Sequence, residues 1–201
     1  MHEITINSDF EEYKKVFLEE NSKHNLISKN DEKYLFEKHI YDSLGIKLFF
    51  KKYNINHAEI LDIGCGGGFP CVPIAIEYPE FDITGLDSIH KKINAVSEIK
   101  EILGLKNLKL ICERAENIKE RHFDIVISRA VADMAKISSY ALPLVKKGGY
   151  FVAYKSKKAI EELQKAEPII NTMGAEVIDI IKYNLPLEEI YERNLICVKK
   201  H

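Results

Sequence analysis

The residues best suited to chemistry form a glycine-rich loop that directly follows an apolar run. The stretch ILDIGCGGGFP, residues 60–70, carries Asp62 near the end of the run and then glycines at positions 64, 66, 67 and 68. Glycines have no Cβ, so the backbone can approach a ligand closely. Ligands of open α/β sheets bind where strands end and helices begin. The loop therefore predicts a ligand site; the alternative is a tight strand–helix turn with incidental acids.

The spacing within the loop discriminates among nucleotide ligands. A dinucleotide fingerprint, G-x-G-x-x-G, would need a glycine where Phe69 or Cys71 stands, and a Walker A loop would need a Gly-Lys-Ser/Thr that the sequence lacks. A carboxylate at Asp62 repels a pyrophosphate and suits a cationic amino group. Asp87 ends the next apolar run, 25 residues later (87 − 62), where an acid commonly holds the hydroxyls of a ribose. An ammonium and a ribose together indicate S-adenosylmethionine.

A third run supplies candidates for the base of this cofactor. The stretch ERAEN, residues 113–117, follows it, and Ala115 and Glu116 stand where an adenine edge would lie. Parallel strands bring their carboxyl ends to one edge of a sheet, so the three strand ends are expected to meet there. Their order favours a cofactor site over an incidental turn.

The elements that must position these residues alternate between strands and helices. Five short apolar runs are typical of strands buried on both faces: 58–64, 81–87, 108–113, 123–129 and 148–155. The predicted helices are 70–79, 89–105, 132–148 and 157–174. This alternation predicts an α/β, Rossmann-like fold with a mainly parallel sheet. Two closing strands, 175–183 and 193–200, have no clear helix between them, which predicts a reversed edge strand.

Residues 1–57 lack this alternation and predict an N-terminal helical extension, with helices at about 8–21 and 31–50. The cofactor-binding domain is then expected over 58–201. Residues 1–15 are typical of neither a signal nor a transit peptide, and no apolar run reaches membrane-spanning length. We therefore expect a cytoplasmic protein, with a monomer as the default state.

Charge and cysteine content limit the partners. The net charge of −2 gives no global attraction to nucleic acid, so any RNA contact must come from a local patch. Five lysine pairs would form such a patch if they shared one rim: 14–15, 51–52, 91–92, 146–147 and 157–158. The four cysteines show neither CxxC nor a zinc spacing, so we expect free thiols and predict no metal site.

Several motifs together carry a family resemblance. Residues 58–200 resemble Class I methyltransferases, and nearly the whole chain resembles the bacterial 16S ribosomal RNA guanine-N7 methyltransferases of the RsmG, or glucose-inhibited division protein B, family. The motifs are HNLIS (24–28), KHIYDSLG (38–45), LDIGCGGGFPCVPIAI (61–76), LDSIHKK (86–92), ERAEN (113–117), ISRAVADM (127–134) and AYK (153–155). The resemblance implies a seven-stranded sheet with an antiparallel last strand. It also implies transfer of a methyl group from S-adenosylmethionine to guanine N7 in 16S rRNA of the small subunit.

The resemblance also implies roles for single residues. Gly64 and Phe69 match cofactor-loop contacts, Ala115 and Glu116 match adenine contacts, and Arg129 matches the arginine between cofactor and substrate. We add Gly66 and Asp87 to the cofactor site from the loop and strand pattern. Gly67 stands where the family often has proline or alanine, and Cys71 where it often has glycine. Neither departure removes a polar group, so cofactor binding is expected to survive.

The chemistry implied for guanine N7 needs positioning more than proton transfer. This nitrogen already carries an in-plane lone pair, so its attack on a methyl group requires no base. Arg129 is therefore predicted to be a positioning residue that holds guanine O6 or a phosphate. The alternative is a salt bridge from Arg129 to Glu116 or Asp62.

Two further residues are candidates for RNA contacts. His39 shares a helical face with Asp42 and Ser43 at i, i+3 and i+4, from which these side chains could cap the cofactor pocket or contact RNA. Lys155 ends the fifth strand and is a candidate phosphate ligand, the alternative being a solvated lysine.

Other functions are less consistent with the sequence. An exocyclic-amine methyltransferase would carry an NPPY-like loop where Ser128-Arg129-Ala130 stands. Cys71 follows a proline, as a cytosine-C5 nucleophile would, but it opens the first helix of the α/β alternation, and we interpret it as a packing residue. A Class I methyltransferase acting on a small molecule or a protein would not need the HIYDSL and SRA motifs. Asp62 and the missing third glycine argue against an NAD-linked binding module.

Overall fold

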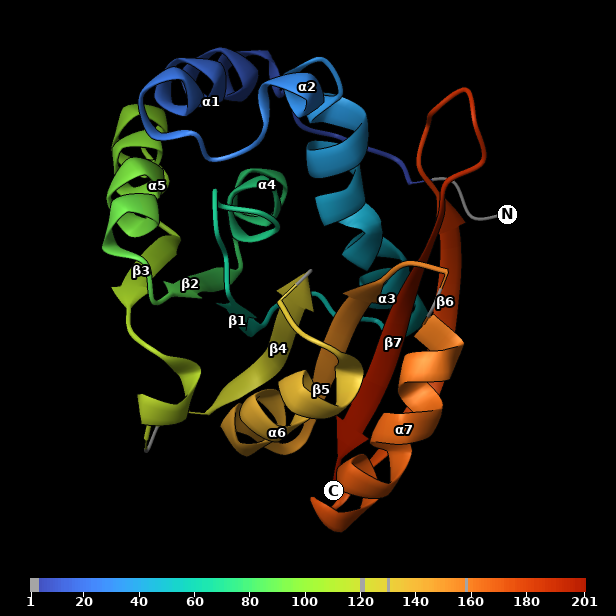
Figure 1. Cartoon of the computed structure of the whole chain (residues 1–201). Helices are drawn as coiled ribbons and strands as arrows, with labels where there is room; N and C mark the ends of the chain where they lie inside the picture. Colours follow the sequence, from blue (N-terminus) through green and yellow to red (C-terminus); the bar gives the residue numbers. More distant parts are fainter. Residues whose placement is uncertain (1–3, 120–121, 130, 158) are drawn as a thin grey trace.

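The computed structural model describes residues 4–119, 122–129, 131–157 and 159–201. Ala130 of the Ser-Arg-Ala motif and Lys158 of the last lysine pair lie outside these residues. Seven strands form one sheet in the order β3-β2-β1-β4-β5-β7-β6 (Figure 1). The strands are β1 (Glu59–Ile63), β2 (Asp82–Asp87), β3 (Leu108–Cys112), β4 (Phe123–Arg129), β5 (Val145–Lys155), β6 (Ala175–Asn184) and β7 (Glu192–Lys200).

The directions of the strands confirm the predicted fold class. Strands β1 to β5 pair in parallel, and β7 is antiparallel to both β5 and β6. The antiparallel last strand is therefore confirmed. Its predicted position at the edge is wrong, because β7 lies between β5 and β6, and β6 forms the edge. The sequence alone does not reveal which of the two closing strands lies inside the sheet and which forms its edge.

Each central strand divides its side chains between two cores. Ile60 packs in one hydrophobic cluster and Leu61 in the other, and Ile125 and Val126 divide in the same way. This is the two-residue period of a strand, and apolar residues at both phases explain why the runs lack polar alternation. One cluster lies under the N-terminal helices and the two helices at 71–77 and 90–103, and the other lies under the helices at 134–141 and 159–172 (Figure 1).

The helices of the α/β part are α4 (Cys71–Glu77), α5 (His90–Leu103), α6 (Met134–Ala141) and α7 (Ala159–Thr172). Gly104 ends α5 in a left-handed conformation, as the sequence predicts. The predicted helix over 132–148 is wrong at its end, since a 3₁₀ turn at Leu142–Leu144 follows α6 and β5 starts at Val145. Pro143 in that turn has no N–H to continue the helix.

The N-terminal part is helical but more broken than predicted. Helix α1 (Glu11–His24) starts later than expected, and α2 (Lys29–Glu32), a π-helix (Leu35–Tyr41), a 3₁₀ turn (Leu44–Ile46) and α3 (Lys47–Lys52) replace one continuous helix. The Glu77 carboxylate accepts the N–H groups of Asn7 and Ser8, each at 2.9 Å, which ties the segment before α1 to α4. The division of the chain at residue 57 stays a prediction.

No helix within the described ranges has the length and apolar character that a membrane crossing requires.

Candidate active site

The glycine loop takes a backbone course that side chains would obstruct. Gly64, Gly66 and Gly68 have φ angles of 73°, 55° and 91°, in the left-handed region. A Cβ on Gly64 would lie 2.4 Å from a methyl carbon of Val131, and one on Gly68 would lie 2.7 Å from Val72. The N–H of Gly64 donates to the Leu86 carbonyl at 2.7 Å, which fixes the loop on β2.

Asp87 joins the loop to the end of β2. Its Oδ2 accepts the Gly66 N–H and its Oδ1 accepts the Ile89 N–H, both at 2.9 Å. Each carboxylate oxygen has two acceptor sites, so one site on each remains for a ligand hydroxyl. The side chain lines a cleft, as the ribose assignment requires.

This cleft, of about 390 Å³, brings together four of the predicted cofactor residues: Gly64, Asp87, Ala115 and Glu116. Ala115 and Glu116 stand in a 3₁₀ turn, Ala115–Asn117, after β3. The volume is in the range of small-molecule sites. With a carboxylate at the ribose position and a close-approach glycine beside it, the residues present fit S-adenosylmethionine.

Asp62 lies under the loop and not in the lining of the cleft. Its Oδ2 accepts the Cys71 N–H at 3.0 Å, at the start of α4. Its Oδ1 is buried and has no hydrogen-bond partner among the described residues. Burial raises the pKa of this carboxyl to about 7, and the Cys71 N–H partly offsets the rise. A contact between Asp62 and a cationic amino group stays a prediction.

Phe69 points away from the cleft, toward the N-terminal helices. Its ring is buried, with centroids of Phe17 and His39 each 5.0 Å from its own. The guanidinium carbon of Arg129 lies 5.3 Å from the same ring centroid, within cation–π range. The side chain of Phe69 therefore supports Arg129. A contact between Phe69 and the cofactor stays a prediction, and it would involve the backbone of this residue.

Arg129 is held by the N-terminal part of the chain. Its Nη1 donates to Asp42 Oδ2 and to the Lys38 carbonyl, both at 3.1 Å. Its Nη2 lies 3.2 Å from His39 Nδ1, which must accept because a guanidinium only donates. The alternative salt bridge to Glu116 or Asp62 is wrong, since Asp42 is the partner.

Asp42 is the centre of a buried charged network that sequence reasoning missed. Arg193 donates to it through Nε at 2.8 Å and Nη2 at 3.1 Å, and the Tyr183 hydroxyl donates to Oδ1 at 2.6 Å. Burial raises the pKa of Asp42, but the charges of Arg193 and Arg129 outweigh it and hold that pKa below its usual value. In the sequence, the signal for this network is the presence of Tyr183 and Arg193 within the two closing strands.

His39 is neutral in this environment. Burial and the nearby Arg129 charge lower its pKa to about 4. With Nδ1 accepting from Arg129, the proton is on Nε2, which is buried without a hydrogen-bond partner among the described residues. His39 stands in the π-helix, a local widening that often occurs at functional sites.

A second cavity, of about 280 Å³, contains His39 and Arg129. Its lining comprises Asp31, Lys38, His39, Asp42, Arg129, Leu185, Tyr191 and Arg193. His39 and Asp42 thus face a common space, whereas Ser43, predicted on the same helical face, is fully buried. Val131, two residues after Arg129, lines the first cleft. The end of β4 therefore lies between the two cavities, and the contact of Arg129 with the cofactor stays a prediction.

Lys155 is neither solvated nor free. Its side chain is 11% exposed, and Nζ donates to Glu162 at 2.7 Å and to the Ala132 carbonyl at 2.6 Å. These bonds fix the segment after β4. The solvated alternative is wrong, and a phosphate contact by Lys155 stays a prediction.

The lysine pairs do not share one rim. Lys146 binds Glu59 and Asp124 at the amino ends of β1 and β4, at the opposite edge of the sheet from the cleft. Lys92 instead lines the cleft.

Four free cysteines are present, and Cys71 is fully buried, which raises the pKa of its thiol and fits the predicted packing role.

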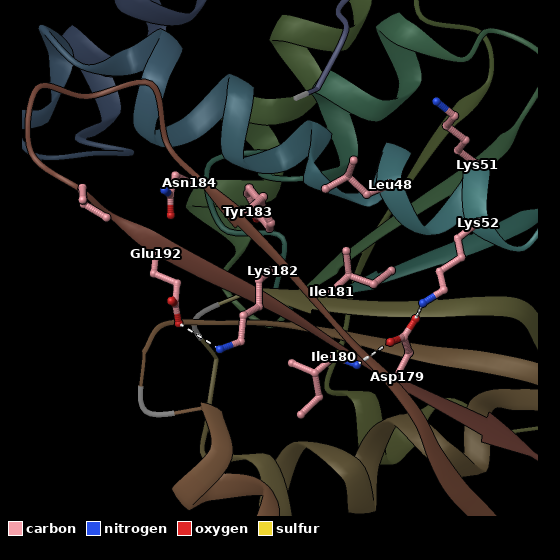
Figure 2. Close-up of a pocket in the computed structure, with 11 residues that line it drawn as sticks. Leu48, Lys51, Lys52, Asp179, Ile180, Ile181, Lys182, Tyr183, Asn184 and Glu192 are labelled. Atoms are coloured by element: carbon pink, nitrogen blue, oxygen red, sulfur yellow. Dashed lines mark hydrogen bonds and ion pairs between the residues drawn. The ribbon is translucent and has the colours of Figure 1, made fainter. Parts of the chain in front are cut away.

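A larger cavity, of about 1110 Å³, lies between α3 and the edge strand β6 (Figure 2). Lys52 pairs with Asp179 there, and Lys182 lies 4.0 Å from Glu192. The lysine pair 51–52 lines it, but none of the predicted cofactor or catalytic residues does.

Comparison with known proteins gives a family match and a set of shared folds. Residues 6–194 match the family model GidB, described as rRNA small subunit methyltransferase G. Proteins named ribosomal RNA small subunit methyltransferase G are similar to this chain. One, from Lachnoclostridium phytofermentans, is 40% identical over 95% of this chain and 80% of its own length. Another, from Bacillus subtilis, is 38% identical over 95% of this chain and 81% of its own length.

Solved structures share the fold at low identity. Magnesium protoporphyrin IX methyltransferase from Synechocystis, solved with bound S-adenosylmethionine, has a TM-score of 0.61 and 15% identity, covering 81% of this chain and 79% of that one. The YcgJ protein from Bacillus subtilis has a TM-score of 0.63 and 15% identity, covering 81% of this chain and 99% of that one. This likeness shows a Class I methyltransferase fold.

Proposed function

The chain belongs to the GidB family of rRNA small subunit methyltransferases, and from this premise we propose that it methylates N7 of one guanine in 16S ribosomal RNA. It is an S-adenosylmethionine-dependent methyltransferase whose substrate is ribosomal RNA. The family match over residues 6–194 is the observation that carries the proposal. The small subunit or an assembly intermediate is the proposed form of the substrate, and a cytoplasmic monomer the proposed form of the enzyme.

The first cleft is the proposed cofactor site. Asp87 would accept the ribose hydroxyls with the lone pairs that Gly66 and Ile89 leave free. The backbone at Gly64 and Gly66 would lie against the cofactor, and Ala115 and Glu116 would contact the adenine edge. The cofactor supplies a methyl group on a positively charged sulfur. Oδ1 of Asp62 lies under the loop and has no hydrogen-bond partner among the described residues. This oxygen suits the amino group of the cofactor if the loop shifts to expose the carboxylate.

The second cavity is the proposed place of the acceptor base. Guanine N7 carries a free lone pair, so the residues around it need to orient the base and not to remove a proton. The groups that face this cavity fit that role, because neither acceptor is available to remove a proton. Asp42 accepts hydrogen bonds from two arginines and a tyrosine, and His39 Nδ1 accepts one from Arg129. Arg129 has N–H donors beyond those it uses here, and they can bind guanine O6 or a phosphate. Contacts of His39 and Lys155 with RNA are part of the same proposal.

Residues 1–57 are the proposed cover of this site. A Cβ on Gly67 would lie 3.0 Å from Leu26, so the chain after α1 lies directly on the glycine loop. Phe17 of α1 packs on Phe69 of the same loop. The extension therefore supports both the loop and Arg129, in addition to any contact with RNA.

Transfer of labelled methyl groups tests the proposal. Small subunits from cells that lack this enzyme would be incubated with the purified protein and S-adenosylmethionine labelled in the methyl group. We expect one methyl group per subunit, recovered in 16S rRNA and not in ribosomal proteins. Label in protein, or in free small molecules alone, would support a different Class I methyltransferase. A thermal-shift screen separates an NAD-linked module, because S-adenosylhomocysteine and not NADH should raise the melting temperature.

A further inference from the structure

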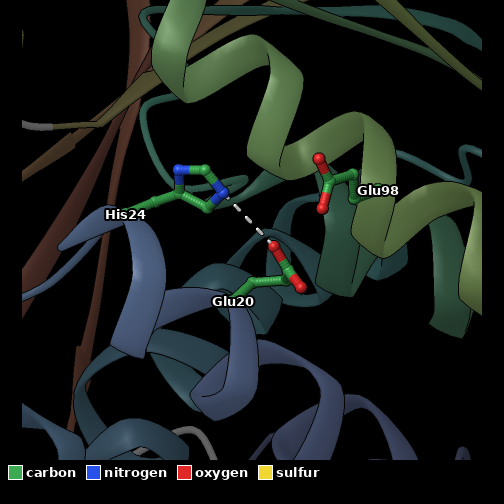
Figure 3. Close-up of side chains that lie close together, drawn as sticks. All are labelled: Glu20, His24 and Glu98. Carbon is green, nitrogen blue, oxygen red and sulfur yellow. Dashed lines mark ion pairs between the residues drawn. The ribbon is translucent and has the colours of Figure 1, made fainter.

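Helices α1 and α5 bring together three groups that ligate metals, away from the cleft. Glu20 and His24 stand one helical turn apart on α1, and Glu98 faces them from α5 (Figure 3). One ligand atom from each residue lies within 4.8 Å of the other two. Two ligands at i and i+4 on one helix recur in zinc sites, because this spacing directs both side chains to the same point.

The buried carboxylate of this cluster is incompletely hydrogen-bonded. The Glu20 side chain is 2% exposed, and although Oε1 binds Lys23 at 2.7 Å, Oε2 has no hydrogen-bond partner among the described residues. Oε2 points toward His24 Nε2 (Figure 3), and the two atoms are 3.5 Å apart. A buried carboxylate oxygen whose contact with His24 is only a long ion pair is incompletely satisfied, and a cation shared by the two side chains would satisfy it.

The separation of these two atoms is too long for a hydrogen bond and suits either an ion pair or a shared metal ion. Hydrogen bonds between nitrogen and oxygen have a length of about 2.7–3.2 Å. Ligands about 2.1 Å from a tetrahedral zinc ion lie about 3.4 Å from each other, close to the 3.5 Å observed. Glu98 is exposed, so its side chain can rotate to complete the site.

We propose that Glu20, His24 and Glu98 bind one divalent transition-metal ion, with zinc favoured by a set of one imidazole and two carboxylates. The fourth position would hold water. The ion would clip α1 to α5 and so hold the N-terminal cover against the element that follows Asp87. This role is structural and independent of the methyl acceptor. The cysteine spacings that usually signal zinc are not involved, so only the packing of α1 on α5 reveals the cluster.

Zinc binding to the full-length protein, stripped of metal with a chelator, tests this inference. Titration calorimetry with zinc chloride should give one site per chain, and cobalt chloride should give the intense visible bands of a four-coordinate ion. Glu98→Gln and His24→Gln should each weaken zinc binding at least tenfold. Glu19→Gln, which removes an exposed acid from the same helix, should bind zinc like the original protein.

Melting temperatures complete the test. Zinc should raise the melting temperature of the original protein and of Glu19→Gln, but not that of Glu98→Gln. Because Glu98 is exposed, its variant is expected to fold, and an unchanged melting temperature without metal verifies this. Absence of a saturable single site would overturn the inference, as would a zinc affinity in Glu98→Gln and His24→Gln equal to that of the original protein. A failure here would leave methyl transfer unaffected, so the two proposals are tested separately.

Discussion

Arg129 and Asp42 form a buried ion pair at 3.1 Å although they are 87 positions apart in the sequence. The pair joins the end of β4 to the N-terminal part of the chain. Since Asp42 also binds Arg193 of β7, one carboxylate fixes two guanidinium groups at the edge of the second cavity. The site therefore depends on the N-terminal segment for its geometry.

Asp42→Asn should destabilise the fold and lower turnover. Removing the carboxylate leaves two buried guanidinium groups without their counter-ion, a change that typically costs about 3–5 kcal/mol. Urea unfolding measures the loss, with Asp31→Asn, a more exposed acid of the same cavity, as the control. Equal stability of the Asp42 variant and the original protein would contradict the role of the network.

The same carboxyl predicts a loss of stability in acid. The folded-state pKa of Asp42 is lowered, so its contribution is present above the unfolded pKa of about 3.9 and is lost as the pH falls through the folded value. Melting temperatures between pH 5 and pH 2.5 should fall more steeply in the original protein than in Asp42→Asn. Parallel curves for the two proteins would show that other groups govern the acid transition.

Asp62 predicts the opposite trend in a different pH range. Its folded-state pKa of about 7 exceeds the unfolded pKa of about 3.9. The folded protein therefore loses stability progressively as the pH rises from about 4 to 7. Asp62→Asn should remove this decline, and urea midpoints at pH 5 and pH 8 would measure it. A decline of the same size in the variant would mean that Asp62 is not the group responsible.

Asp87→Asn should weaken S-adenosylhomocysteine binding at least tenfold, because it removes the carboxylate that we propose accepts both ribose hydroxyls. Titration calorimetry is the direct measurement. Asp82→Asn is a matched control, since Asp82 is exposed at the opposite end of the same strand. Unchanged affinity in the Asp87 variant would remove this residue from the cofactor site.

Arg129→Lys should lower the turnover number at least tenfold while the protein stays folded. Lysine keeps the charge but lacks the planar fork with which Arg129 binds Asp42 and His39 and, in our proposal, the substrate. Turnover and melting temperature would be measured together. If turnover stayed unchanged in the folded variant, Arg129 would not position the substrate.

Gly64→Ala should destabilise the loop more than Gly104→Ala destabilises α5. Both glycines have positive φ, 73° and 64°, so both variants carry backbone strain of about 1 kcal/mol. Only at Gly64 does the new Cβ meet another atom, Val131 at 2.4 Å, whereas at Gly104 nothing lies within 4 Å. Equal losses in urea unfolding would mean that Val131 moves aside without cost.

Local patterns predicted the strands and the meeting of three strand ends at one cleft, because both depend on neighbours in sequence. Apolar runs ending in glycine or acid predicted β1 and β2, and the residues at their ends meet in one cleft. The partners of Arg129 were not predictable in this way. They come from the π-helix and β7, and only tertiary packing brings Asp42 and Arg193 to the same place. The partners of Lys155, which are the Ala132 carbonyl and the Glu162 carboxylate, were not predictable from the local pattern either.

Chemical mapping of the methyl group tests the central claim most directly. Small subunits methylated by the purified protein would be treated with borohydride and aniline, which cleave RNA at N7-methylguanine, and the cuts located by primer extension. We predict a single new cleavage at one guanine of 16S rRNA, formed at least tenfold more slowly when the folded Arg129→Lys variant replaces the original protein. Labelled 16S rRNA without any such cleavage would contradict the assignment of N7 as the acceptor.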